Sequence, residues 1–426
     1  MYRLSKEEYF LFLIEPILMM IFSFVVGRKK KNFMSYAQQV GLEYSWALLS
    51  AVASLIFASL LRRALVPLRV PSVLCILAAG TIFRLGLGYF DNVTSNFLEI
   101  TEVVVDTTLA AMGLRIGSHF NLSAIRAARG SLWKFAFVFV PVVVVIVTIS
   151  AYLIFPGSGV MNVAVGCIAL ERSSPEALAS ITESQSSGPF TSATICVAAL
   201  QDVLALVCFV SALAFAGATS FRQALSDLFV LFLYTLASAV VGVVAVRRLD
   251  GRRPIFQAVV LLFILVIFHL VLRTELLLAA IVTGVILNFR SSHPTAAWLE
   301  SVRETTDVIL FTFLGFRINF LAYVSELGGA SALFVTRLSA LWAGAWIGGH
   351  AAGFPSNNDI RWMGLITQLA VALSLVMRIE VIQGHAALAR AYGGAVLMAL
   401  VTGPILLVFA LHQAEEVGMV VPVDKS

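Results

Sequence analysis

Long runs of apolar residues follow one another along nearly the whole chain, and they constrain its fold more than any other feature. One helix needs about 20 apolar residues to cross a bilayer, and the sequence offers roughly fourteen runs of that order. Hydrophobic residues make up 60% of the 426 residues and charged residues 12%, whereas soluble domains carry about 25% charged residues. The runs do not alternate and are too long for barrel strands, so we expect an all-α polytopic membrane protein.

The connections between these runs carry most of the basic residues. Arginines gather after the second, fourth, eighth and tenth runs, which predicts that these loops are cytoplasmic. The net charge of +5 therefore indicates topology rather than a nucleic-acid partner. A basic loop at 28–31 follows the first run on the side that this parity places outside. We therefore interpret 1–43 as an uncleaved accessory helix and its loop, with a signal peptide or anchor as the alternative. The expected spans are 9–27, 44–61, 71–89, 97–115, 131–155, 160–182, 190–217, 225–246, 254–272, 274–289, 305–323, 330–352, 360–377 and 394–412.

Two halves of the chain resemble each other at an offset of about 200 residues. DTTLAAMGLRI (106–116) resembles DVILFTFLGFRI (307–318), and LCILAAGTIF (74–83) resembles LLAAIVTGVIL (277–287). Spans two to seven pair in order with spans nine to fourteen and leave one linker span between them. An odd linker makes the second set enter from the opposite face, so we expect inverted six-helix repeats, as in many secondary transporters. The expected units are repeat 1 at 44–217, the linker helix at 225–246, repeat 2 at 254–412 and a short tail at 413–426.

One acidic residue, Asp202, lies near the middle of the apolar run 190–217, directly after Gln201. An ionisable group at this depth costs several kcal/mol and is a functional hypothesis by default. The surroundings decide whether such a carboxyl binds a proton or stays ionised beside a cation. Asp202 is therefore a candidate proton or cation site.

The preceding span, GCIALERSSPEALASITES, is interrupted in its middle by charged groups, hydroxyls and a proline that cannot continue the helical hydrogen bonds. A broken helix at membrane depth exposes carbonyl groups, which is tolerated where they line a cavity or an ion site. A loop between two short helices is the other interpretation, but it leaves the pairing of spans incomplete. The interrupting residues are Glu171, Arg172, Ser173, Ser174, Pro175 and Glu176.

The span that pairs with this one is GLITQLAVALSLV (364–376), in which Thr367 and Gln368 form a polar pair and no proline occurs. Two crossed, interrupted helices would compensate each other's dipoles. A further basic residue, Arg317 in FTFLGFRINF, is a candidate partner for the ionised carboxylate, with a side chain that snorkels from a helix end as the alternative. The four cysteines lie in spans without metal-ligand spacing, so we expect no metal centre and no cofactor.

These residues together resemble the monovalent cation/proton antiporters, especially the branch with the Kef-type potassium/proton antiporters. RSSPEALASITESQSSGPFTSATICVAALQDVLALV looks like the family stretch in which a proline break precedes an acidic pair, with Asp202 at the place of the transport aspartate. Ser173, Ser174 and Pro175 match the first break, LITQLAVALSL looks like the second, and TELLLAAIVTGVILN resembles the ninth-helix pattern. Arg317 matches a basic residue of the family. The resemblance implies a six-helix core domain that moves against a dimerisation domain, a homodimer in the bilayer, and exchange of protons for monovalent cations.

Two departures from the family pattern affect what the resemblance implies. The residue before the aspartate is Gln201, as in the Kef-type pattern, where other exchangers have Asp or Asn. One fewer carboxylate implies one-for-one, electroneutral exchange of K⁺ or Na⁺ for H⁺. Glu171 and Arg172 stand where the family usually has small apolar residues, which implies altered gating or selectivity.

Other classes of function fit the sequence less well, and we expect no enzyme. An intramembrane aspartyl protease needs two facing aspartates, usually with a Gly-x-Gly-Asp sequence that this chain lacks. A serine hydrolase would need a histidine near Ser173 or Ser174, and that span and its neighbours contain none. A channel or a transport-inactive regulatory relative stays open as the alternative, because Gln201 and the added charges are also compatible with lost transport.

Overall fold

The computed structural model describes residues 52–63, 72–87, 91–118, 129–173, 177, 181, 184–217, 220–248, 254–272, 276–288, 303–318, 320–353, 360–382 and 384–418. Every regular element within these ranges is helical. The expected accessory helix and basic loop at 1–43 lie outside the described residues. The expectation of an all-α fold is confirmed.

The helices follow the expected spans in order. Residues 52–63 are helical. Short 3₁₀ helices precede two of the longer helices: η2 comes before α7, and η3 comes before α17. The bounds are α3 Ser72–Leu87, α4 Asp91–Ser118, α6 Arg129–Ile154, η2 Pro156–Ser158, α7 Val160–Ile168, α9 Pro189–Gly217, α10 Phe221–Arg248, α11 Pro254–Leu272, α12 Leu276–Asn288, α14 Arg303–Arg317, α15 Phe320–Ser325, α16 Leu327–Ala352, η3 Arg361–Leu365, α17 Ala370–Glu380 and α18 Ala386–Gln413.

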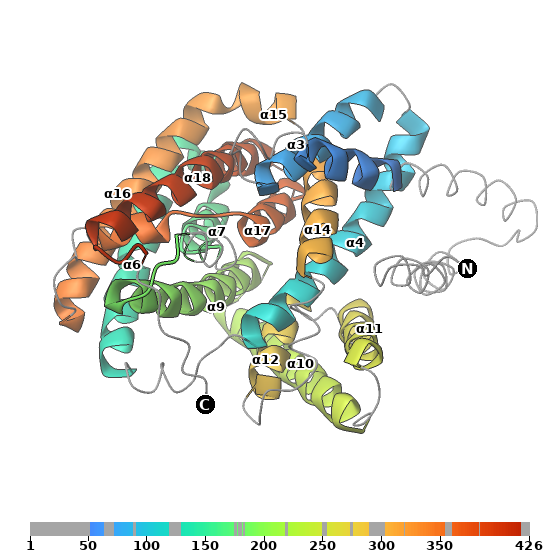
Figure 1. The fold of residues 1–426 in the computed structure, drawn as a ribbon, viewed down its shortest axis with the longest axis horizontal. Helices are drawn as coiled ribbons and strands as arrows, with labels where there is room; N and C mark the ends of the chain where they lie inside the picture. Colours follow the sequence, from blue (N-terminus) through green and yellow to red (C-terminus); the bar gives the residue numbers. More distant parts are fainter. Residues whose placement is uncertain are drawn as a thin grey trace, which may run out of the picture.

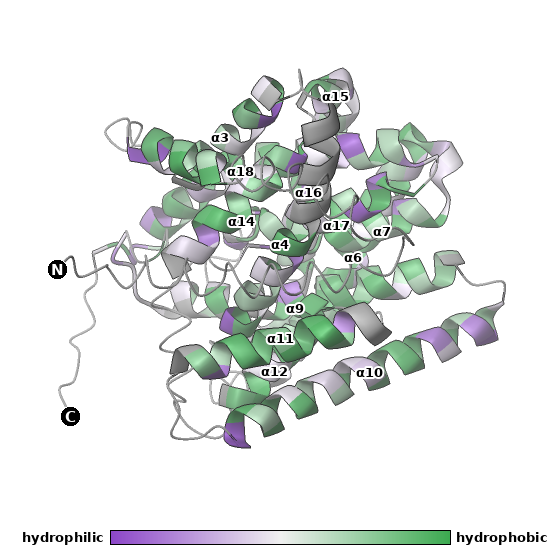
Figure 2. Ribbon diagram, turned by 90° about the vertical axis from the view of Figure 1, so that its right-hand side faces the viewer, coloured by the Kyte–Doolittle hydropathy of each residue, from purple (hydrophilic) through white to green (hydrophobic). Residues whose placement is uncertain are grey.

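Several of these helices have the length and composition of membrane spans. Among the described residues, five are long and apolar enough to cross a bilayer: Gly130–Ile154, Ala193–Ala216, Phe221–Arg248, Leu327–Ala352 and Ala386–Gln413. Figure 2 shows α10 as a helix that is hydrophobic along most of its length and hydrophilic at its ends, as expected for a span. The chain is a multi-pass integral membrane protein.

The helices pack in two groups, which lie side by side in Figure 1. The first, which we name the core group, contains α6, α7, α9, α16, η3, α17 and α18. The second, which we name the scaffold group, contains α3, α4, α10, α11, α12 and α14. Contacts of α9 with α10 and of α17 with α14 join the two groups.

The packing follows the pairing expected for an inverted repeat. In this pairing α3 corresponds to α12, α4 to α14, α6 to α16, α7 to η3 and α17, and α9 to α18. The structure packs α3 on α14 and α4 on α12, and it packs α7 on α9 and α17 on α18. The contact of α3 with α14 is thus the counterpart of the contact of α12 with α4, and the contact of α7 with α9 is the counterpart of the contact of α17 with α18. Helix α6 packs on its own counterpart, α16.

Glycines at two of these contacts let helix backbones approach closely. A Cβ atom at Gly80 of α3 would lie 2.0 Å from the Thr312 carbonyl oxygen of α14. A Cβ atom at Gly284 of α12 would lie 2.3 Å from the Leu114 carbonyl oxygen of α4. The two contacts occupy equivalent places in the repeats. The sequence similarity pairs Gly113 with Gly315, whereas the helix packing pairs Gly117 with Gly315. The two alignments of the repeats therefore differ by about one helical turn.

The expected single span at 305–323 is wrong in one respect, because it is divided into α14 and α15. The last carbonyl groups of α14 are satisfied from another helix instead of by a further turn. Arg84 of α3 donates from Nη1 to the carbonyl oxygens of Phe316, at 3.2 Å, and Arg317, at 2.5 Å. The Ile318 amide closes a tighter turn on Gly315, so the helix ends there.

Candidate functional site

Two interrupted helices meet in the middle of the core group. Helix α7 ends at Ile168 and the chain is non-helical at 171–173. In the second half, η3 ends at Leu365, 366–369 are non-helical and α17 begins at Ala370. The amide of Ser173 donates to the Thr367 carbonyl oxygen at 2.8 Å, which joins the two non-helical segments. The predicted crossing of broken helices is present, and its second break forms without a proline.

The carbonyl ends of both broken helices are satisfied by side chains from elsewhere in the core group. Gln368 donates from Nε2 to the Ile168 carbonyl oxygen at 2.7 Å. The guanidinium of Arg337, on α16, is completely buried. It donates to the carbonyl oxygens of Ala169 at 3.0 Å, Glu171 at 3.1 Å, Leu365 at 3.5 Å and Ile366 at 2.6 Å. One positive charge therefore offsets the negative dipole ends of two half-helices.

Arg337 is a residue that the sequence reading missed. Its signal was available, because an arginine in the middle of the 26-residue apolar helix α16 is as unusual as an aspartate in α9. Without the tertiary structure, nothing indicated that its partners would be backbone carbonyls of two distant segments.

Asp202 is buried at the crossing, with 2% of its surface exposed. The amide nitrogen of Arg172 lies 3.4 Å from Asp202 Oδ1, so the non-helical segment 171–173 presents a backbone donor to the carboxylate. The Arg172 side chain is completely buried and donates from Nη1 to the Thr194 carbonyl oxygen of α9 at 2.8 Å. Its charge interacts with those of Asp202 and Glu171. Arg172 thus faces Asp202 with its backbone amide, while its guanidinium is held at the Thr194 carbonyl oxygen.

Several buried polar atoms around Asp202 have no hydrogen-bond partner among the described residues. They belong to one arginine, one amide and three hydroxyl groups, all from α9 or the two non-helical segments. Buried polar groups in proteins nearly always have a hydrogen-bond partner, which is often ordered water. The atoms are Nε and Nη2 of Arg172, Oγ of Ser173, Oγ1 of Thr194, Nε2 and Oε1 of Gln201, and Oγ1 of Thr367.

Most predicted site residues that the structure describes meet at this crossing. Asp202, Gln201, Ser173 and Arg172 come from the first repeat, and Thr367 and Gln368 come from the second. Three further predicted residues, Ser174, Pro175 and Glu176, lie outside the described residues.

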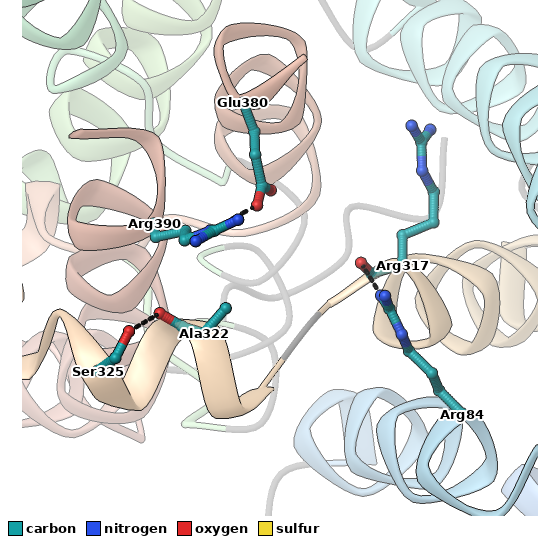
Figure 3. A network of polar contacts seen from close by, with 6 residues as sticks. All are labelled: Arg84, Arg317, Ala322, Ser325, Glu380 and Arg390. Atoms are coloured by element: carbon teal, nitrogen blue, oxygen red, sulfur yellow. Dashed lines mark hydrogen bonds and ion pairs between the residues drawn. The ribbon is translucent and has the colours of Figure 1, made fainter. Parts of the chain in front are cut away.

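Arg317 lies at the end of α14, in the scaffold group. Its side chain extends away from the Arg84 guanidinium that contacts its carbonyl oxygen (Figure 3). The nearby acidic group in the same view is Glu380, which accepts from Arg390 Nε at 3.0 Å. The expected pairing of Arg317 with Asp202 stays a prediction. The contact with Asp202 that the structure provides comes from the backbone amide of Arg172.

The oxygen atoms at the crossing are the kind that bind alkali cations. Carboxylate, amide, hydroxyl and carbonyl oxygens replace the hydration shell of such ions in proteins. No group of three or more His, Cys, Asp or Glu side chains in the described part of the chain could hold a resident metal ion. A carboxylate beside such oxygen atoms can bind either a proton or a monovalent cation.

Comparisons with known proteins identify the family and the fold. The family described as "Sodium/hydrogen exchanger, transmembrane" matches residues 48–413. A solved structure of a sodium/proton antiporter from Methanocaldococcus jannaschii is similar to the chain with a TM-score of 0.67 at 15% sequence identity, over 85% of this chain and 98% of that one. This identity is low, so the structural likeness indicates the fold alone. No curated protein sequence matched the chain.

Proposed function

Because the chain belongs to the sodium/hydrogen exchanger family, which makes it a cation/proton antiporter of the membrane, we propose that Asp202 is the group on which the two ions compete. In this mechanism the carboxyl of Asp202 binds either H⁺ or a monovalent cation and faces each side of the membrane in turn. Proton and cation are coupled because one carboxylate cannot hold both.

The observation that carries the proposal is the burial of Asp202 among polar atoms with no partner in the described residues. Ser173, Thr367 and Gln201 supply hydroxyl and amide oxygens within the same crossing. A cation that sheds its water shell needs such replacement ligands, and a protonated Asp202 does not. The arrangement therefore supports an exchange of the two ions rather than transport of both together.

Arg172 is the basic partner in this proposal, in the role that the sequence gave to Arg317. When neither ion is bound, its buried charge stabilises the carboxylate of Asp202. An incoming cation or proton displaces this interaction. In the protein without a bound ion, the buried carboxylate of Asp202 therefore does not lack a compensating charge.

We further propose that the exchange is electroneutral and that the protein acts as a homodimer on K⁺ or Na⁺. Gln201 is buried beside Asp202 and adds an amide where a second carboxylate would add a charge. A single carboxylate that carries one monovalent cation one way and one proton the other way moves no net charge.

The alternative function is a transport-inactive or channel-like relative with a regulatory role. The observation in its favour is the buried guanidinium of Arg172, which already places a positive charge beside Asp202. In this alternative the arginine replaces the transported cation permanently, so no pH gradient drives cation flux.

The test is exchange in liposomes that contain the purified protein and a pH-sensitive dye. A pH gradient should drive uptake of Na⁺, K⁺ or Li⁺ that saturates, and the half-saturating cation concentration should rise about tenfold for each pH unit below the titration of Asp202. Asp202→Asn should abolish exchange. The matched control is Asp227→Asn, an exposed residue at the start of α10 that should exchange normally.

Exchange that survives in Asp202→Asn would contradict the proposed mechanism. Wild-type protein that is folded but shows no cation-dependent dye response would favour the regulatory alternative. Flux that does not saturate and needs no counter-ion would favour a channel.

A further inference from the structure

The residues that follow the last long helix return to the start of the helix that carries Asp202. After α18 ends at Gln413, the chain packs against residues 184–188, which precede α9. The Ser187 amide donates to the Glu416 carbonyl oxygen at 3.2 Å, and the Gly418 amide donates to the Ser184 carbonyl oxygen at 3.3 Å. The parity of the spans puts the start of α9 and the end of α18 on the same side of the membrane, and the structure brings them into contact.

The carboxylate of Glu416 closes the first turn of α9. Its Oε1 accepts from the Phe190 amide at 2.7 Å, and its Oε2 accepts from the amide and the hydroxyl of Thr191, each at 2.7 Å. The first amides of a helix have no partner within the helix, and a negative charge there is favoured by the helix dipole. Only 6% of Glu416 is exposed, so these bonds are shielded from water.

Gly188 makes this contact possible. A Cβ atom at this position would lie 2.2 Å from Cδ of Glu416, so a residue larger than glycine would displace the carboxylate. The loop before α9 is thus shaped to accept a side chain from the far end of the chain.

A second element joins the same cluster from the other repeat. Arg361, in η3, is buried, lies 5.9 Å from the centroid of the Phe190 ring and interacts electrostatically with Glu416. Gly364 of η3 also lies against Thr194 of α9. The ends of α9, η3 and α18 are therefore held together by one buried acidic group and its partners.

The capped turn of α9 is connected to the ion site. Thr191 and Thr194 are three residues apart, so they lie in adjacent positions of one helical turn. The Thr194 carbonyl oxygen accepts from the Arg172 guanidinium at 2.8 Å, and the Arg172 amide faces Asp202. A movement of the first turn of α9 would therefore move the anchor of Arg172.

We propose that Glu416 is a positioning residue of the exchanger: it holds the first turn of α9 so that Arg172 stays beside Asp202. This inference rests on the proposed function, because it assigns a role relative to the carboxylate that exchanges the ions. Glu416 does not touch the ions. It determines how strongly Arg172 stabilises the ionised form of Asp202.

The test compares pH profiles of exchange in liposomes for Glu416→Gln and for Glu415→Gln, the exposed neighbour of Glu416. Glutamine keeps an acceptor but loses the charge, so Arg172 should be held less firmly and Asp202 should be protonated more easily. The pH of half-maximal exchange should rise by about half to one unit, a threefold to tenfold change in proton affinity. Glu415→Gln should keep the wild-type profile, and Glu416→Asp should recover part of the shift.

A double-mutant cycle identifies the route of the effect. Arg172→Ala should itself raise the pH of half-maximal exchange, and Glu416→Gln should add no further shift in that background. If Glu416→Gln cannot be recovered folded, Thr191→Val replaces it, because this variant loses one of the three bonds to the carboxylate and should shift the profile in the same direction.

Three outcomes would overturn the inference. Glu416→Gln, or Thr191→Val in its place, could reduce the amount of folded protein or the maximal rate while the pH profile stays unchanged, which would make the role purely structural. The shift could also persist in full in the Arg172→Ala background, which would exclude action through Arg172. Equal shifts in Glu415→Gln and Glu416→Gln would mean a general effect of surface charge. Absence of exchange in the wild-type protein would instead refute the proposed function itself.

Discussion

At the scale of single residues, the site depends on where the backbone leaves the helix. Arg172 presents its amide to Asp202 because 171–173 are non-helical, and its side chain turns to the Thr194 carbonyl oxygen. The same residue thus contributes a backbone donor that any amino acid except proline would provide and a charge that only a basic residue provides. These two contributions can be separated by substitution.

Arg172→Ala should keep exchange but shift its pH profile. The backbone amide remains, whereas the buried charge that favours the ionised carboxylate is lost, so Asp202 should bind its proton at higher pH. We expect the pH of half-maximal exchange to rise by about one unit. Dye quenching in liposomes at graded pH measures it, and Arg222→Ala, at an exposed position of α10, is the control. An unchanged profile would mean that the charge of Arg172 is compensated by Glu171 and not by Asp202.

At the scale of helical elements, the second break needs an explanation because no proline causes it. The carbonyl groups of Leu365 and Ile366 would normally accept bonds from the next helical turn, but they accept from Arg337. The Thr367 carbonyl oxygen accepts from Ser173 of the other repeat. Each break therefore supplies the partners that make the other break tolerable in a bilayer.

Arg337→Met should destabilise the protein strongly. Methionine fills a similar volume but leaves buried carbonyl groups of both half-helices without donors, which costs at least about 3 kcal/mol. Thermal unfolding in detergent, followed by size-exclusion chromatography, measures the loss. Arg337→Lys should be intermediate, and Arg222→Met, exposed on α10, should resemble the wild type. A stable Arg337→Met protein would show that the carbonyl groups find other partners.

Helix α3 offers a matched pair of glycines for testing the close packing of the scaffold group. Gly80→Ala should lower the stability by about 1–3 kcal/mol, because the added methyl group meets the backbone of α14. Gly86→Ala, on the same helix, meets nothing within 4 Å and should change the stability by less than about 1 kcal/mol. The same unfolding assay compares them. Equal effects would mean that α3 and α14 separate easily.

At the scale of the whole molecule, the described helices pack in two groups with different contents. The core group contains Asp202 and both broken helices, whereas the scaffold group packs through glycine contacts such as those of Gly80 and Gly284. Among the described residues, contacts of α9 with α10 and of α17 with α14 join the two groups, and one hydrophobic cluster contains residues of both.

Gln201→Asp should convert neutral exchange into exchange that carries net charge. A second buried carboxylate can bind a second proton while one cation is still carried in return, so each cycle would move one charge. An imposed membrane potential should then accelerate or slow dye quenching in the variant but not in the wild type. Gln201→Asn, which adds no charge, is the control. A potential-dependent wild type would contradict the proposed electroneutrality.

The sequence predicted more of the fold than of the site's electrostatics. Spans, repeat pairing, the first break and Asp202 follow from hydropathy and from the cost of a buried carboxylate, and the residues described by the structure agree with them. The division of the span at 305–323 was not predicted, because it depends on Arg84 reaching the carbonyl groups of another helix.

The sequence by itself determined that the chain crosses a membrane many times, in two related halves, with one carboxylate at mid-depth. Length, apolar character and the order of the spans are local properties that need no tertiary contact. Only the tertiary structure decided that the Arg172 amide faces Asp202, that Arg337 closes both broken helices, and that Glu416 returns to cap α9. These contacts join segments that lie far apart in the chain. Because a long basic or acidic side chain can pair with any backbone group within its reach, its partner is fixed by packing rather than by its neighbours in sequence.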